Sequence, residues 1–182
     1  MTSFVLPPAE SSGSTESARV SVLKQQIGFD AALATERSGE YVALPLDTLS
    51  APENLLGWPL ERETVQLSAT ETMLRMRFAR GDARITVRIT AFAPQERQRV
   101  AARLIERADA VTHAQITDTR GPKDLGTLSL TPATSPAASA TQSVYWIYRN
   151  LYAEVVVSKA PLDAIAVARA VQRQFVAATR PM

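Results

Sequence analysis

Residues 74–89, LRMRFARGDARITVRI, decide the fold that we expect for this chain. Their centre, Gly81-Asp82, is a preferred two-residue hairpin loop, because glycine adopts φ > 0 without a Cβ penalty. This loop predicts a register with three apolar cross-strand pairs: Phe78 with Ile85, Met76 with Val87, and Leu74 with Ile89. A shift by one residue would turn arginine side chains toward the core instead. We therefore predict two antiparallel strands joined at this loop.

The other face of the same hairpin is cationic. The register that pairs the apolar residues also sets Arg75 opposite Arg88, Arg77 opposite Thr86, and Arg84 opposite Ala79. Like charges that face each other destabilise a sheet, so these guanidinium groups need solvent, a stacking neighbour or an anion. Solvent exposure under an arginine-rich codon usage is the simpler of these explanations.

A third strand, over residues 61–69, precedes this hairpin and is joined to it by a four-residue turn at 69–72. The register that keeps apolar faces together pairs Leu67 with Leu74 and Val65 with Met76. The same register places Arg62 on the cationic face. Three antiparallel strands with one apolar and one polar side are typical of a sheet that packs on a single layer.

A second hairpin is expected over residues 143–158. Its turn lies near Asn150, a residue type that tolerates the left-handed conformation. One face of this hairpin is apolar throughout, whereas the other is mixed and carries Tyr145, Ile147, Tyr152 and Glu154. Each hairpin precedes a predicted helix that starts after a proline, so hairpin and helix occur in the same order at 73–111 and 143–178.

These elements predict one α+β domain over residues 18–182. It has an antiparallel sheet of about six strands and two helices packed on one face, with a possible hairpin-helix pseudo-repeat. The remaining predictions are a disordered arm at 1–17, a helix at 18–36 weakened by Gly28, a short strand at 41–44, strands at 114–119 and 125–130, and a flexible loop at 131–142.

Composition excludes several kinds of active site. The chain has no cysteine, so a disulfide scaffold and a thiolate zinc site are excluded. His113 is the only histidine, and the seven glycines form no phosphate-binding loop. We therefore predict no catalytic residue, no metal site and no cofactor. A small hydrolase with a site near His113 is kept as a second alternative function.

Neither the charge nor the hydropathy of the chain identifies its compartment. The formal net charge is +2, and no apolar run is long enough to cross a bilayer. The first residues lack a basic segment followed by a long apolar one, as a secretory leader requires. A cytoplasmic protein is expected by default, or an exported one if a leader was removed.

Two surfaces are candidates for function. The first is the arginine face of Arg62, Arg75, Arg77, Arg84 and Arg88, and the second is the tyrosine face of Tyr145 and Tyr152. Tyrosine is enriched at interfaces, although burial beneath the N-terminal helix would explain this face equally well.

The preferred function is a non-enzymatic interaction or assembly module that binds a protein partner, with an acidic surface as one candidate and a homo-oligomer as another. A nucleic-acid or other polyanion binder is the alternative, although no aromatic residues interleave the arginines as in single-strand binders.

Overall fold

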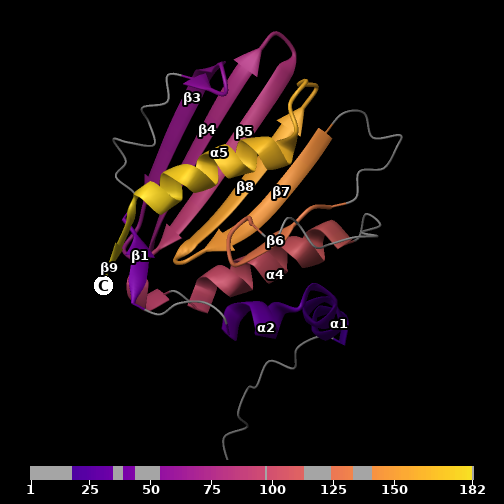
Figure 1. Cartoon of the computed structure of the whole chain (residues 1–182), viewed down its shortest axis with the longest axis vertical. Coiled ribbons are helices and arrows are strands. Elements are labelled where there is room, and N and C mark those ends of the chain that lie inside the picture. Colours follow the sequence, from indigo (N-terminus) through magenta and orange to yellow (C-terminus); the bar gives the residue numbers. More distant parts are fainter. Residues whose placement is uncertain are drawn as a thin grey trace, which may run out of the picture.

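The computed structural model describes residues 18–34, 39–43, 54–96, 98–112, 124–132 and 141–181 (Figure 1). The predicted arm at 1–17, the strand at 114–119, His113 and most of the loop at 131–142 lie outside the described residues. The helices are α1 (Ala18–Ile27), α2 (Phe29–Ala34), η1 (Pro94–Glu96), α4 (Gln98–Thr112) and α5 (Ala164–Ala177). The strands are β1 (Glu40–Val42), β2 (Asn54–Leu55), β3 (Trp58–Leu67), β4 (Glu71–Arg80), β5 (Ala83–Phe92), β6 (Leu128–Leu130), β7 (Thr141–Tyr148), β8 (Leu151–Ser158) and β9 (Thr179–Pro181).

The sheet is antiparallel, with the strand order β3-β4-β5-β8-β7-β6 and the short β2 beside the start of β3. Strands β1 and β9 form a separate two-stranded sheet. The predicted α+β class and the antiparallel sheet of about six strands are confirmed. The two hairpins lie next to each other through the pairing of β5 with β8, so one sheet unites both halves of the chain.

The central hairpin has the predicted register. Phe78 pairs with Ile85, Met76 with Val87, and Leu74 with Ile89, while Arg75 lies opposite Arg88. Gly81 adopts φ 59°, as a two-residue loop with glycine in its first position requires. All six apolar side chains are buried.

The predicted register of the preceding strand is wrong by two residues. Val65 pairs with Leu74 and Leu67 with Thr72, because the turn is shorter than the sequence suggested. The hydroxyl of Ser68 accepts hydrogen bonds from the backbone amides of Thr70 and Glu71. These bonds stabilise a tight turn, so the chain reverses direction earlier than predicted. Side chains alternate with a period of two, so a shift by two keeps each residue on its predicted face.

The prediction that both helices pack on one face of the sheet is wrong. Helix α5 crosses the apolar face of the sheet (Figure 1). Its Val167, Val171 and Phe175 side chains join the core formed by the central hairpin. Helix α4 packs on the opposite face with Leu104, against Tyr145, Ile147 and Tyr152 of β7 and β8. The reason is that β7 and β8 carry large apolar side chains on both faces, so each face needs cover. Hairpin and helix do occur twice in the predicted order, but the two helices lie on opposite sides.

The N-terminal helix forms as two pieces. Helices α1 and α2 are separated at Gly28, which has φ 65°, the residue that weakened the prediction of a single helix. Leu23 and Phe29 are buried in the same cluster as α4 and β6. The N-terminal segment therefore adds to the cover of the β6–β8 half of the sheet.

The second hairpin turns at Arg149-Asn150, but the left-handed residue is Arg149, with φ 57°, and not Asn150 as predicted. Asn150 is buried, and its side-chain oxygen accepts a hydrogen bond from the amide of Val42 at 2.7 Å. Its side-chain nitrogen donates to the carbonyl oxygens of Val42 at 3.2 Å and Phe92 at 2.9 Å. One amide side chain thus ties β1 to the end of β5.

Candidate anion-binding groove

The face of the sheet that carries α4 is covered over β6, β7 and β8, and a hollow of about 470 Å³ lies over β3, β4 and β5. It is lined by Arg62, Thr64, Gln66, Met73, Arg75, Arg77, Arg88 and Arg103. We call this set of residues the arginine groove. Seven of the eight side chains project from the sheet, and Arg103 comes from α4. The floor of the groove is therefore sheet, and a helix supplies one of its cations.

The strand register sets these arginines in two rows across the sheet. Arg62 lies opposite Arg77 in one row, and Thr64, Arg75 and Arg88 follow one another in the next. Neighbouring strands are about 4.8 Å apart, so the guanidinium groups share a small area. Like charges placed directly opposite each other raise the free energy of the sheet unless anions compensate them.

Three carboxylates of the described chain compensate part of this charge. Glu61 lies 2.6 Å from the Nε atom of Arg77, and Glu154 lies 3.4 Å from the Nη1 atom of Arg88. Arg103 pairs with Glu106 one turn further along α4, at 3.3 Å. Within the described part of the chain, Arg62 and Arg75 have no acidic partner. The groove thus holds two uncompensated cations beside three paired ones.

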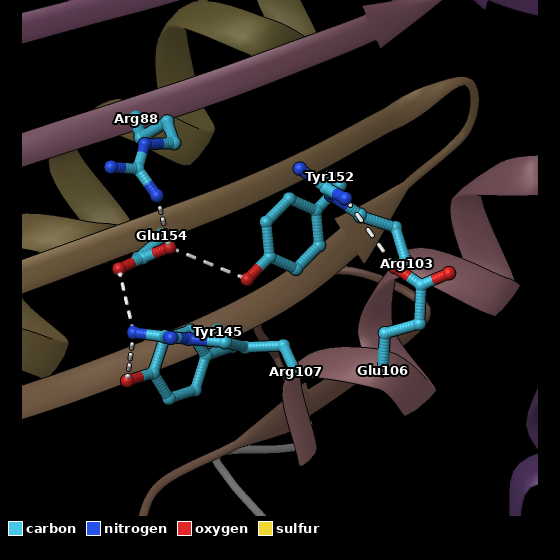
Figure 2. Close-up of polar contacts among 7 residues, drawn as sticks. All are labelled: Arg88, Arg103, Glu106, Arg107, Tyr145, Tyr152 and Glu154. Carbon is cyan, nitrogen blue, oxygen red and sulfur yellow. Dashed lines mark hydrogen bonds and ion pairs between the residues drawn. The ribbon is translucent and has the colours of Figure 1, made fainter. Parts of the chain in front are cut away.

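Glu154 marks the boundary between the covered and the open half of this face. Its side chain is 8% exposed and lies among groups from three elements (Figure 2). It accepts hydrogen bonds from Arg88 of β5, from the Nη2 atom of Arg107 in α4 at 3.2 Å, and from the hydroxyl of Tyr152 at 3.5 Å. The Arg107 guanidinium also lies 4.9 Å from the centre of the Tyr145 ring and donates to its hydroxyl.

This network keeps its members in defined protonation states. Burial, and then the charge of Glu154, raise the pKa of the Tyr152 hydroxyl well above its ordinary value. Tyr152 is therefore a neutral donor at physiological pH. Partial burial works against the charge of Arg107, but Glu154 and Tyr145 outweigh it and raise the pKa of this guanidinium. Arg107 consequently stays cationic while its side chain is half-buried.

The structure brings together four of the five arginines predicted for the cationic face: Arg62, Arg75, Arg77 and Arg88. Arg84 is not among the residues that line the groove, because its guanidinium donates to the carbonyl oxygens of Gly81 and Ala83 at the hairpin turn. Arg103 was missed as a groove residue. Nothing in the helical pattern signals it, because its position depends on the packing of α4 against the sheet.

The two tyrosines predicted as an interface are buried. Tyr145 and Tyr152 each have 3% of their surface exposed and lie beneath α4, not beneath the N-terminal helix that was considered. The proposed tyrosine surface is therefore not available for docking, and these side chains belong to the core and to the Glu154 network.

Two further properties of the described residues bear on the site. No group of three or more metal-ligating His, Asp or Glu side chains lies together among them. No helix among them is both long and apolar enough to cross a lipid bilayer. The hydrolase alternative depended on His113, which lies outside the described residues.

Comparison with known proteins adds no relative. No family model matches the chain, and neither the curated proteins nor the solved structures that were searched show a match.

Proposed function

We propose that this protein is a non-enzymatic interaction module that binds an acidic protein partner through the arginine groove. The observation that supports this function is the pair Arg62 and Arg75, two guanidinium groups that form no ion pair with the described residues, in a hollow with three further arginines. Guanidinium groups present paired donors that match a carboxylate, and they are less strongly hydrated than lysine. Two or more carboxylates on one surface would complete the charge pattern of the groove.

The lining of the groove favours carboxylates over nucleic acid. Its residues other than arginine are Thr64, Gln66 and Met73, so it offers no aromatic ring on which a base could stack. The formal net charge of the chain is only +2, which provides little long-range attraction to a polyanion. The electrostatic attraction is thus local to the groove and suits a partner with a small acidic patch.

The direct test is the affinity of a labelled oligoglutamate peptide for the wild-type chain and for Arg62→Glu and Arg75→Glu. Each substitution removes a charge-assisted contact and adds a repulsion, so we expect each to weaken binding by about tenfold or more. The matched control is Arg173→Glu, which makes the same charge change at an exposed position of α5, on the other side of the sheet. This control should stay within about twofold of wild type, because salt screens distant surface charges.

Two outcomes would contradict the proposal. Equal weakening in all three variants would show that binding follows the net charge and not the groove. Tighter binding of a single-stranded oligonucleotide of equal charge, lost in Arg75→Glu, would establish the polyanion alternative instead. Binding of each probe over a range of salt concentrations separates the two, because release of counterions from nucleic acid gives the steeper dependence.

A further inference from the structure

The strand that carries Arg62 is the outer strand of the sheet. Strand β3 pairs with β4 from Leu60 to Leu67, with a register shift between Leu60 and Arg62. On its other side β2 pairs only with Pro59 and Trp58, so β3 lies at the edge beyond them (Figure 1). Over residues 60–67 no second strand pairs with β3 in the part of the chain that the structure describes. Every second amide and carbonyl of this stretch therefore points away from β4, as at any sheet edge.

The two faces of this edge differ: one carries an arginine with polar side chains, and the other carries two apolar side chains beside Glu63. Arg62, Thr64 and Gln66 point into the arginine groove. Val65 and Leu67 lie on the other face and are 37% and 69% exposed. One more strand, added at this unpaired edge and carrying apolar side chains on the same face, would cover both side chains.

We infer that the partner binds as an extended segment of alternating acidic and apolar residues that adds to β3 as a further strand. This inference rests on the proposed function, because its acidic side chains are the carboxylates that the groove takes. Successive side chains of a strand point to opposite faces, so one register directs every acidic residue to the groove and every apolar residue to Val65 and Leu67. Main-chain hydrogen bonds to the edge would supply affinity, and the alternation would supply specificity.

A second copy of this chain fits the same edge poorly. Two β3 strands paired with each other would place Arg62 of both copies on one continuous face. The rows that contain Arg75 and Arg77 would then flank them on both sides. Glu61 is the β3 carboxylate that pairs with a groove arginine, and its partner Arg77 already takes up this charge. Charge complementarity therefore favours a different, acidic chain as the added strand.

The experiment measures the affinity of a short peptide that alternates glutamate and valine, with the intact protein. Two N-methylated forms are compared: one carries methyl groups on the amides of the glutamates, the other on those of the valines. In an added strand every second amide bonds to the edge, so one form should lose about 100-fold in affinity, the effect of about three hydrogen bonds, while the other stays near the parent peptide. A peptide of equal composition with its glutamates contiguous should bind about tenfold more weakly, because only part of its charge reaches the groove.

The outcomes separate this inference from the proposed function. Equal affinities of the two N-methylated forms, together with weakening by Arg75→Glu, would overturn the added strand and leave the acidic-partner function intact. Equal binding by wild type and Arg75→Glu would overturn the proposed function. Release of a protein dimer by the parent peptide, measured by sedimentation, would show that a second copy occupies the edge, which also overturns the inference.

Discussion

The two faces of the sheet differ in how far the chain covers them. On the face under α5, the six paired apolar side chains of the central hairpin are all buried, among them Leu74, Phe78 and Ile89 with no exposed surface. On the opposite face, α4 and the N-terminal helices cover β6, β7 and β8, and the arginine groove occupies the other half. The first face stabilises the fold, and the second divides into a stabilising half and a half that is open to a partner.

The difference has a geometric cause. Six strands about 4.8 Å apart span roughly 24 Å, whereas one helix with its side chains is about 10 Å across and covers little more than two strands. On its face, helix α5 runs obliquely across the sheet (Figure 1). The side chains of β4 and β5 pack into the same core as those of β7, β8 and α5. On the other face the uncovered strands carry arginine, which tolerates water, and so no further helix is needed.

The largest expected effect comes from the closed face. Phe78→Ala leaves a cavity beneath α5 and should lower the free energy of unfolding by about 3–5 kcal/mol in urea denaturation. Leu67→Ala, at a side chain 69% exposed, is the control and should cost less than about 1 kcal/mol. Both side chains lie on the face under α5, so comparable losses in the two variants would show that the core around Phe78 is not closed as described.

The next effect compares two ion pairs of the arginine face. Glu154→Gln removes the charge that Arg88 and Arg107 share at a buried position, and we expect a loss of about 1–3 kcal/mol in the free energy of unfolding. Glu61→Gln removes the partner of Arg77 at an exposed position, where both side chains are about two-fifths exposed, and should cost about 0–1 kcal/mol. If Glu61→Gln were the more destabilising change, Glu154 would not mark the boundary between the half covered by α4 and the arginine groove.

Alkaline pH should affect the covered half selectively. Burial raises the pKa of Tyr152 above the value of about 10 that tyrosine has in an unfolded chain, so the unfolded state releases this proton first. The stabilisation is complete below about pH 10 and is lost above it, by up to about 1.4 kcal/mol per pH unit. Urea denaturation at pH 8, 10 and 11 should show a smaller decline for Tyr152→Phe than for wild type. An unchanged decline in this variant would assign the alkaline sensitivity to other groups.

The smallest effect is expected in the open half. Arg75→Gln removes one of two arginines that face each other across β4 and β5, and it breaks no ion pair within the described chain. The free energy of unfolding should therefore change by no more than about 0.5 kcal/mol, with relief of repulsion as the favoured direction. Urea denaturation measures this change. A loss above about 2 kcal/mol would mean that Arg75 stabilises the fold and is not available to a partner.

Local spacing was enough to predict the central hairpin. Gly81-Asp82 predicts the turn, and the turn predicts each pair from Leu74 with Ile89 to Phe78 with Ile85. The predicted register of β3 was wrong by two residues. Hydrogen bonds of the Ser68 side chain shorten the turn before β4, and the spacing of apolar residues does not indicate them. The side chains that become the floor of the groove were predictable, because alternation within a strand sets their face.

Features that join distant segments could not be predicted. Tyr152 looked like an interface residue because its strand is mixed on that face, and only the docking of α4 shows that it is buried. Asn150 looked like a turn residue, yet its side chain bonds Val42, a residue 108 positions away in the chain.

Short-range periodicity was thus sufficient to specify the α+β class, the strand register of the central hairpin and the side of the sheet on which the arginines lie, because these depend on the spacing of residues within one hairpin. Which face each helix covers, and so which arginines remain open and which carboxylate becomes buried, followed only from packing in three dimensions. Contacts such as that of Arg107 with Glu154 join residues 47 positions apart and are selected by the burial of whole elements, a property that no local pattern encodes.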